Sequence, residues 1–208
     1  MHACFIVCLL SADMLLMAGK LYKRIFFLST FKTFTDLPLS NATLRAVNDL
    51  GFTELTPIQA QILPHTLANQ DAIGQAQTGT GKTATFLLTI MEALLKRPFA
   101  ADEKRYLGEP RAVVMAPTRE LAQQIFDDCI ALTKYTSLHS VCIMGGTNYE
   151  TQQHELERQY VDILIATPGR LLDLMHKGMV YLDRVEELVL DEADRMLDIG
   201  FIPDLKRL

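Results

Sequence analysis

Short apolar runs alternate with segments of helical period along most of this chain, and this alternation restricts its fold more than any other feature. Runs rich in Val, Ile and Leu predict buried strands at residues 71–75, 111–116, 140–144, 161–166 and 187–190. Helical segments lie between them, at residues 82–96, 119–134, 149–159 and 169–177. This order predicts an α/β fold, in which helices cover both faces of a parallel sheet. Functional residues are then expected in the strand-to-helix loops, because such sheets bind ligands at the carboxyl ends of their strands.

The composition fits one globular domain and limits the ways in which it can bind ligands. The chain has 208 residues, 49% of them hydrophobic and 22% charged, which is enough for a sizeable core. A formal net charge of −5 argues against a broad basic surface, so any contact with nucleic acid must be local. The four cysteines form no C-x-x-C pair, which disfavours a metal site or a disulfide framework and favours a cytoplasmic protein.

Residues 1–30 form an N-terminal extension whose role the sequence leaves open. An apolar run covers residues 3–12, but no Lys or Arg precedes it, Asp13 follows it, and a spanning helix needs roughly 20 apolar residues. A secretion signal or a membrane anchor is therefore disfavoured. Met14 and Met17 allow another explanation, in which the natural start lies downstream of Met1 and this extension is misassigned or disordered.

A glycine-rich loop follows the first predicted strand and opens a helix, which is the setting of a phosphate-binding loop. It consists of Ala76, Gln77, Thr78, Gly79, Thr80, Gly81, Lys82 and Thr83. Glycines let successive N–H groups point at phosphate oxygens, Lys82 would reach the β and γ phosphates, and Thr83 would bind Mg²⁺. Ala76 departs from the general pattern, which has glycine there. The alternative is a simple turn with an exposed lysine, but strand, loop and helix occur together here.

An acidic segment ends the last predicted strand. Asp191, Glu192 and Asp194 follow the apolar residues 187–190, at the end of the strand where a parallel sheet binds its ligand. Asp191 is expected to hold Mg²⁺, and Glu192 to polarise the water that attacks the γ-phosphate. Two carboxylates on a loop are more often simply solvated, so this assignment depends on the phosphate-binding loop.

With these two motifs, the chain from about Phe34 to its last residue resembles the DEAD-box ATP-dependent RNA helicases. Other motifs of the family occur in order at residues 51–59 (GFTELTPIQ), 117–122 (PTRELA), 145–146 (GG) and 167–170 (TPGR). The loops are most similar to those of bacterial members, including the helicase that joins the RNA degradosome. The resemblance implies a RecA-like P-loop NTPase domain, with adenine recognition at residues 31–60 and an incomplete ATP-binding domain at 61–208.

The resemblance also implies two sets of binding residues. Gln59 would contact the edge of adenine and Phe34 its face, although Leu55 replaces a proline that the family commonly has. Gln59 also completes a capping box with Thr56, which is a structural alternative. RNA backbone contacts are implied for Thr118, Arg119, Gly145, Gly146, Thr167, Gly169 and Arg170. Taken singly, these threonines are more often helix caps and the glycine pair a turn.

The implied activity is ATP-dependent remodelling or unwinding of RNA, with ATP and Mg²⁺ as cofactors. In the family, arginines from a second domain complete the site, and Asp194 would interact with a Ser-Ala-Thr motif. The second domain and the Ser-Ala-Thr motif both lie outside the 208 residues. The sheet of the first domain is also expected to lack a strand, which would leave an exposed edge. A monomer is expected, with RNA bound without sequence preference, RNA-decay proteins as partners and no membrane. A catalytically silent ATP- and RNA-binding module and a DNA helicase remain the alternatives.

Overall fold

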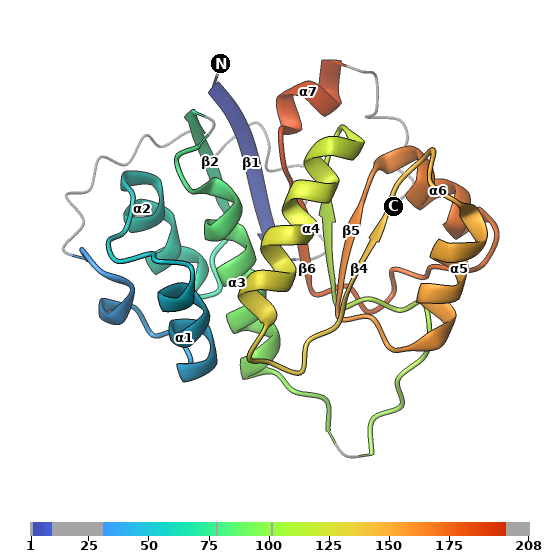
Figure 1. The fold of residues 1–208 in the computed structure, drawn as a ribbon, viewed down its shortest axis with the longest axis horizontal. Helices are drawn as coiled ribbons and strands as arrows, with labels where there is room; N and C mark the ends of the chain where they lie inside the picture. Colours follow the sequence, from blue (N-terminus) through green and yellow to red (C-terminus); the bar gives the residue numbers. More distant parts are fainter. Residues whose placement is uncertain (1, 10–30, 78, 101, 199–208) are drawn as a thin grey trace.

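A six-stranded sheet forms the centre of the protein, as Figure 1 shows for the computed structural model, which describes residues 2–9, 31–77, 79–100 and 102–198. The strands lie in the order β2-β1-β6-β3-β5-β4. Their bounds are β1 (His2–Leu9), β2 (Ala72–Gln77), β3 (Ala112–Met115), β4 (Ser140–Ile143), β5 (Ile163–Ala166) and β6 (Glu187–Leu190). Neighbouring pairs among β6, β3, β5 and β4 are parallel, whereas β1 runs antiparallel to both β2 and β6.

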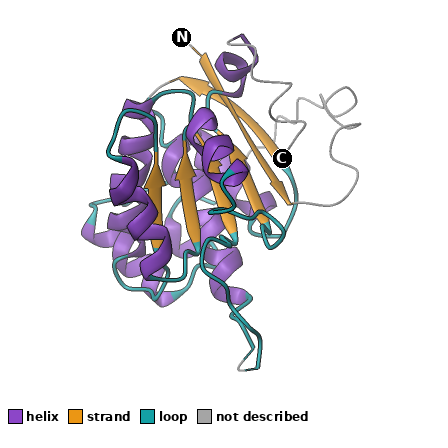
Figure 2. Ribbon diagram, turned by 90° about the vertical axis from the view of Figure 1, so that its right-hand side faces the viewer, coloured by secondary structure: helices purple, strands orange, loops and turns teal. Residues whose placement is uncertain are grey.

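The helices follow the strands as the sequence predicts. They are η1 (Phe34–Asp36), α1 (Asn41–Asp49), α2 (Pro57–Thr66), α3 (Lys82–Lys96), α4 (Arg119–Thr133), α5 (Tyr149–Arg158), α6 (Pro168–His176) and α7 (Ala193–Asp198). The bounds of α3 and β6 agree with the predicted residues 82–96 and 187–190, and the other predicted elements differ by one or two residues at one end or at both. The predicted α/β architecture is therefore confirmed (Figure 2).

Two hydrophobic cores lie on the two faces of the sheet, because successive side chains of a strand point to opposite faces. In β3, Val114 belongs to the core formed with η1 and α1 to α4, whereas Val113 and Met115 belong to the core formed with α5, α6 and α7. Helix α3 is almost wholly enclosed: twelve of its residues are buried, including Phe86 and Leu87. Since α3 begins at Lys82, this burial fixes the position of the loop before it.

The strand β1 was not predicted from the sequence. Its apolar residues 2–9 were assigned to an extension of open role, whereas the structure pairs them with β2 and β6 in the interior of the sheet. Residues 10–30 lie outside the described residues. The position of the natural start, like the expected loss of a strand from the sheet, therefore stays a prediction.

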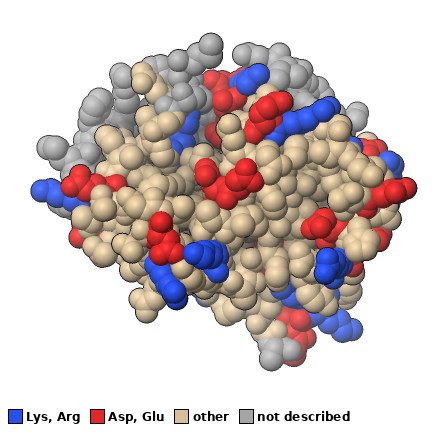
Figure 3. All heavy atoms as spheres, viewed as in Figure 1, with Lys and Arg blue, Asp and Glu red and all other residues tan. Residues whose placement is uncertain are grey.

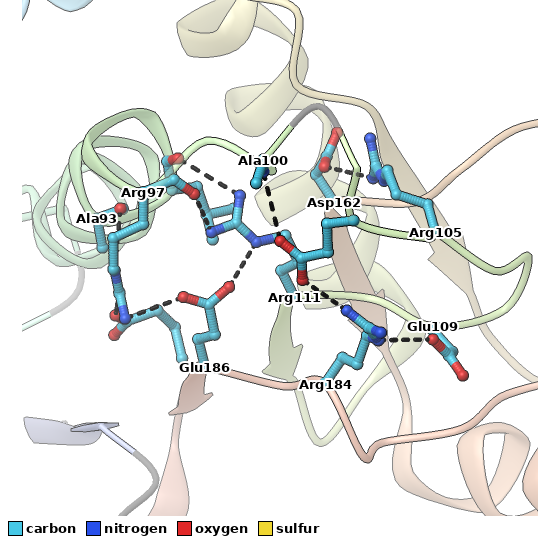
Figure 4. Close-up of polar contacts among 12 residues, drawn as sticks. Ala93, Arg97, Ala100, Arg105, Glu109, Arg111, Asp162, Arg184 and Glu186 are labelled. Atoms are coloured by element: carbon cyan, nitrogen blue, oxygen red, sulfur yellow. Dashed lines mark hydrogen bonds and ion pairs between the residues drawn. The ribbon is translucent and has the colours of Figure 1, made fainter.

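Ion pairs join the amino-terminal ends of the strands to the segment between α3 and β3 (Figure 4). Arg97 and Arg111 both bind Glu186, with N–O distances of 2.9 and 2.5 Å, and Arg105 binds Asp162 at 2.6 Å. These contacts lie at the end of the sheet opposite the phosphate-binding loop. Within the described residues, no helix combines the length and the apolar character needed to cross a membrane.

Candidate functional site

The loop between β2 and α3 has the backbone shape that its glycines allow. Gly79 and Gly81 have φ angles of 77° and 87°, in the left-handed region that favours glycine, and Gly81 caps α3. The side chain of Lys82 is 7% exposed, and its Nζ donates a hydrogen bond to the carbonyl of Ala76 at 2.9 Å. The side chain of Lys82 therefore reaches back to the first residue of the phosphate-binding loop. Thr83 is half-buried on the first turn of α3, and Thr78 lies outside the described residues.

Gln59 joins this loop to the start of α2. Its Oε1 accepts a hydrogen bond from the N–H of Thr56 at 2.9 Å, which completes the capping box. Its Nε2 donates to the carbonyl of Gly81 at 3.2 Å. A Cβ atom at Gly81 would meet Gln59 Nε2 at 2.5 Å, so a side chain there would displace the Gln59 amide, and the φ angle of 87° also favours glycine. The capping alternative is therefore present in the structure, and Gln59 also contacts the phosphate-binding loop.

Phe34 is more buried in the hydrophobic core than a residue that stacks on adenine is expected to be. Its side chain is 3% exposed and belongs to the core beside α1 to α4. The ring of Phe52 stacks on it, with centroids 6.2 Å apart and an interplanar angle of 26°. Phe52 is 40% exposed, so it presents the accessible face of this aromatic pair. Adenine stacking by Phe34 stays a prediction, and Phe52 becomes a second candidate that the sequence analysis did not single out.

The acidic segment follows β6 at the same edge of the sheet as the phosphate-binding loop. Asp191 is 4% exposed, and its Oδ1 accepts a hydrogen bond from the N–H of Glu192 at 2.9 Å. Burial raises the pKa of Asp191 to about 6, while the Glu192 N–H and the ammonium of Lys82 act to lower it. The two motifs thus interact electrostatically across the sheet edge.

The neighbours of Asp191 have different surroundings. Glu192 has a φ angle of 48°, unusual for a residue other than glycine, and is half-buried with its Oε2 3.2 Å from Arg195. Asp194 is exposed on the first turn of α7. Its expected interdomain role stays a prediction.

The donor set at this edge fits Mg²⁺. Thr83 offers a hydroxyl oxygen and Asp191 a carboxylate whose burial disfavours its charge, which a bound cation would offset. Mg²⁺ usually takes only one or two protein ligands and completes its shell with water and substrate phosphates. Two oxygen donors from the protein are therefore sufficient.

A cavity of about 640 Å³ lies beyond β6, over the carboxyl ends of β3, β5 and β4. It gathers six of the seven residues expected to contact RNA, from three separate loops: Thr118, Arg119, Gly145, Thr167, Gly169 and Arg170. Pro117, Glu120 and Asp173 also line it. The sequence analysis missed Glu120 and Asp173, although both lie within one helical turn of predicted residues. On the face shown in Figure 3, acidic and basic side chains are interspersed, and no broad basic surface is visible there.

The threonines at this cavity have different roles. Thr118 caps α4, because its Oγ1 accepts a hydrogen bond from Leu121 N–H at 3.2 Å. Thr167 precedes α6 but makes no side-chain cap, and its Oγ1 instead accepts from Gly145 N–H at 3.4 Å. The capping alternative thus describes Thr118 and not Thr167, which joins two loops of the cavity.

Both arginines of the cavity lie against neighbouring residues. Arg119 covers the glycine pair: a Cβ atom at Gly146, whose φ angle is 78°, would meet Arg119 NH1 at 1.9 Å. Arg170 NH1 donates to Gln152 Oε1 at 2.8 Å, and its guanidinium lies over the ring of Tyr149. The backbone angle at residue 146 therefore favours glycine, and a methyl group there would displace the guanidinium of Arg119.

Backbone hydrogen bonds link the two regions across the sheet. Asp191 N–H donates to Met115, Ala116 N–H to Ala166, and Thr167 N–H to Ile143, at 2.9, 3.0 and 3.0 Å. Each bond joins residues at the carboxyl ends of adjacent strands. The acidic segment is thus connected through the sheet edge to the loops of the cavity.

The chain is similar to known proteins along most of its length. The sequence model described as DEAD/DEAH box helicase matches residues 56–208. ATP-dependent RNA helicase RhlB of Pseudomonas putida is 55% identical over 175 residues, which cover 84% of this chain and 44% of that protein. The RhlB protein of Shewanella amazonensis is 48% identical over 179 residues, covering 86% of this chain and 40% of that protein.

A solved structure is similar over a comparable part of the chain. The crystal structure of a DEAD box protein from the hyperthermophile Methanococcus jannaschii matches with a TM-score of 0.70 and 32% identity. The match covers 85% of this chain and 46% of that one. The chain thus spans less than half the length of these relatives.

Proposed function

This chain belongs to the DEAD/DEAH box helicase family, and from that premise we propose that it binds ATP and RNA as the first-domain part of an ATP-dependent RNA helicase. One observation carries the ATP-binding part of this proposal: Lys82 and Asp191 are both buried at one edge of the sheet, and the charge of Lys82 opposes the rise that burial causes in the pKa of Asp191. A buried cation and a buried carboxylate at strand ends suit a nucleotide whose phosphates take both as partners.

Each residue of the nucleotide site has a defined task in this proposal. The N–H groups at the start of α3 and the ammonium of Lys82 bind the β and γ phosphates, since donors there face a negatively charged ligand. Thr83 and Asp191 would hold Mg²⁺, which neutralises charge that develops on the γ-phosphate. Glu192 accepts a proton from the water that attacks the phosphorus atom. Gln59 selects adenine, and Phe34 or Phe52 packs against its face.

The cavity over β3, β5 and β4 is the proposed RNA site. Arg119 and Arg170 supply positive charge there, and the starts of α4 and α6 supply N–H donors, which together suit backbone phosphates. Such contacts carry no base sequence, so we propose binding of single-stranded RNA with little sequence preference. The names of the relatives, ATP-dependent RNA helicase RhlB, support RNA rather than DNA as the ligand. Cytoplasmic location, a monomeric state and RNA-decay partners belong to the same proposal.

Substitution of Lys82 tests the ATP-binding part of this proposal. Lys82→Ala removes the single lysine of residues 76–83, so affinity for a non-hydrolysable ATP analogue with Mg²⁺ is expected to fall about 100-fold. Lys96→Ala, at the other end of α3, is the matched control and should bind like the unchanged chain. Equal affinities of the two variants in a calorimetric titration would remove Lys82 from the site.

A further inference from the structure

Helix α5 has a buried polar side chain to which the proposed function gives no task. Gln152 is 6% exposed, and Gln152 and Leu156 are the two buried residues of this largely polar helix. Residues four positions apart share one face of a helix, so both point into the protein. Leu156 belongs to the hydrophobic core formed with α5, α6 and α7, whereas Gln152 brings a carboxamide into the interior. A buried carboxamide needs hydrogen-bond partners within the protein.

The partners of Gln152 lie in two of the segments that line the cavity. Its Nε2 donates to the carbonyl of Met144 at 3.0 Å and also to Oγ1 of Thr147, on either side of the glycine pair. Its Oε1 accepts from NH1 of Arg170, at the start of α6, at 2.8 Å. Because a carbonyl only accepts and a guanidinium only donates, these partners determine which end of the amide faces which segment. Gln152 thus holds Arg170 to the turn formed by the glycine pair.

The ring of Tyr149, on the first turn of α5, also contacts this guanidinium. Its centroid is 5.5 Å from Cζ of Arg170, a distance at which an aromatic ring attracts a cation. Tyr149 and Gln152 are both described in the structure, and neither lines the cavity. Gln152 takes one N–H donor of the guanidinium and leaves others for a ligand. The two contacts therefore restrict Arg170 without occupying the cavity.

From these contacts, and given the RNA site proposed above, we propose that Gln152 and Tyr149 are positioning residues for RNA binding, which hold the guanidinium of Arg170 at the cavity. A free arginine side chain loses much rotamer freedom when it binds a phosphate, whereas one that is already held loses less. The hydrogen bonds from Nε2 to the turn anchor the amide, and Oε1 then fixes Arg170. Both residues thus raise RNA affinity without contacting RNA.

An apolar replacement of similar length tests the role of Gln152. Gln152→Met retains the helix and most of the buried volume but removes the hydrogen bonds, so affinity for a short single-stranded RNA is expected to fall about fivefold. Gln153→Met is the matched control, because Gln153 is half-buried at the next position and binds Glu157 Oε1 at 2.8 Å instead. It should bind RNA like the unchanged chain. Equal affinities of the two variants, measured by fluorescence anisotropy, overturn the role of Gln152.

Tyr149→Leu gives a second test that does not depend on the folding of the Gln152 variant. It removes the ring beside Arg170 and is expected to lower RNA affinity about threefold. Affinity for the ATP analogue is the control for the fold in every variant and should stay unchanged, because Lys82 and Asp191 follow β2 and β6. Parallel losses of RNA and ATP-analogue affinity would assign both residues to general stability and overturn the proposal.

The salt dependence of RNA binding shows whether Arg170 is released. For single strands, the logarithm of the affinity falls with the logarithm of the salt concentration by about 0.7 for each phosphate contact. Arg170→Ala should reduce this slope, and Gln152→Met should reduce it in the same direction although it removes no charge. An unchanged slope in Gln152→Met would mean that Arg170 still binds its phosphate, which overturns the positioning role.

A double-mutant cycle shows whether Gln152 acts through Arg170. In the Arg170→Ala background, Gln152→Met should change RNA affinity less than about twofold, because the guanidinium is gone, and a loss that remains about fivefold there overturns the positioning role. If the unchanged chain binds no single-stranded RNA, the proposed RNA site fails and this role fails with it. If the unchanged chain binds RNA and Arg170→Ala weakens binding while Gln152→Met does not, the RNA site stands and only the positioning role is wrong.

Discussion

The side chain of Gln59 makes one hydrogen bond within the capping box of α2 and another to the phosphate-binding loop. Its amide oxygen binds Thr56 N–H in the capping box, and its amide nitrogen binds the carbonyl of Gly81 in the phosphate-binding loop. A carboxamide suits adenine, because it can donate and accept at once. In the proposed adenine role, Gln59 would exchange one of these two hydrogen bonds for a hydrogen bond to the base.

Replacing Gln59 separates base recognition from capping. Gln59→Ala is expected to lower the preference for ATP over GTP about tenfold, because the donor and acceptor for adenine are lost. Thr56→Ala is the matched control, since it removes the capping hydroxyl, should cost about 1 kcal/mol of unfolding free energy and should leave base preference alone. Competition titrations with GTP and chemical unfolding of both variants measure the two effects. Unchanged discrimination in Gln59→Ala, with a loss of stability only, assigns Gln59 to the cap.

Gly146 is a residue at which the backbone and the proposed RNA site depend on each other. Gly146→Ala places a methyl group where Arg119 NH1 lies and also strains a φ angle of 78°. We expect roughly 1 kcal/mol of destabilisation from the backbone, together with about a tenfold loss of RNA affinity from displacement of Arg119. RNA binding is measured by fluorescence anisotropy with a short single strand.

Gly178→Ala controls for the backbone effect. Gly178 also has a positive φ angle, 67°, but the nearest atom to an added Cβ would be the hydroxyl of Tyr181 at 3.1 Å, and this residue does not line the cavity. It should lose a similar amount of stability and keep its RNA affinity. If the two variants bind RNA with equal affinity, then displacement of Arg119 by the methyl group at residue 146 does not affect RNA binding, and the prediction is wrong.

At the scale of elements, the start of β6 contains a carboxyl group that gives stability a definite pH dependence. Glu187 is 1% exposed, its Oε1 binds Arg97 at 2.6 Å, and its Oε2 has no hydrogen-bond partner among the described residues. Burial raises the pKa of Glu187 from 4.5 to about 7, against the opposing effect of Arg97. The folded protein therefore favours the protonated carboxyl group more than the unfolded chain does.

The sign of the effect follows from this shift. The contribution of Glu187 is fully present below about pH 4.5 and is lost as the pH rises through about 7, by at most about 3 kcal/mol. Glu187→Gln mimics the protonated group, so its stability relative to the unchanged chain should increase across this window. Glu155→Gln, at an exposed residue of α5, is the control, because it removes a carboxyl group on another element. Denaturant titrations between pH 4.5 and 8 measure the difference, and parallel curves for Glu187→Gln and the unchanged chain contradict the prediction.

The elements that sequence could predict are those whose signals are local. The starts of α2, α3 and α4 follow from the capping threonines at residues 56 and 118 and the glycine at residue 81, and the start of α6 follows from Pro168 at its first position. The parallel part of the sheet follows from the alternation of elements. The strand β1 could not be predicted, because an apolar run near a terminus looks the same whether it is a signal, a disordered tail or a strand. Its pairing with β2 and β6 depends on residues about 70 and 180 positions away.

The sites show the same limit. The phosphate-binding loop and the acidic segment were assigned from contiguous motifs, and the six clustered cavity residues from motif order. Tertiary partners were not predictable: Thr167 binds Gly145 rather than capping its own helix, and Phe52 covers Phe34. These contacts join segments that are separate in sequence, so no local pattern contains them.

At the scale of the whole molecule, the two proposed sites lie side by side along one edge of the sheet, which suggests how ATP and RNA would influence each other. Nucleotide residues follow β2 and β6, and cavity residues follow β3, β5 and β4. The strands β6 and β3 are neighbours, and Asp191 N–H donates to Met115 at their common end. A shared sheet edge of this kind would place the two ligands relative to each other, but coupling between them needs two states that both ligands distinguish.

A polypeptide limited to residues 1–208 should therefore bind both ligands and hydrolyse ATP at most feebly, without RNA stimulation or duplex unwinding. The γ-phosphate spreads its charge in the transition state, and this chain offers Lys82, Thr83 and the acidic pair, whereas the family resemblance implies arginines from a second domain. An arginine finger contributes about 10³ to 10⁵ in rate in comparable hydrolases, which outweighs the residues present. The test compares this polypeptide with the whole RhlB protein of Pseudomonas putida, of which the match covers 44%, in ATPase assays with and without single-stranded RNA and in displacement of a short duplex. The Glu192→Gln variant is the negative control for ATP hydrolysis, because its amide cannot accept the proton from water. ATP-dependent strand separation by residues 1–208 alone would show that one domain suffices, and that arginines from elsewhere are not required.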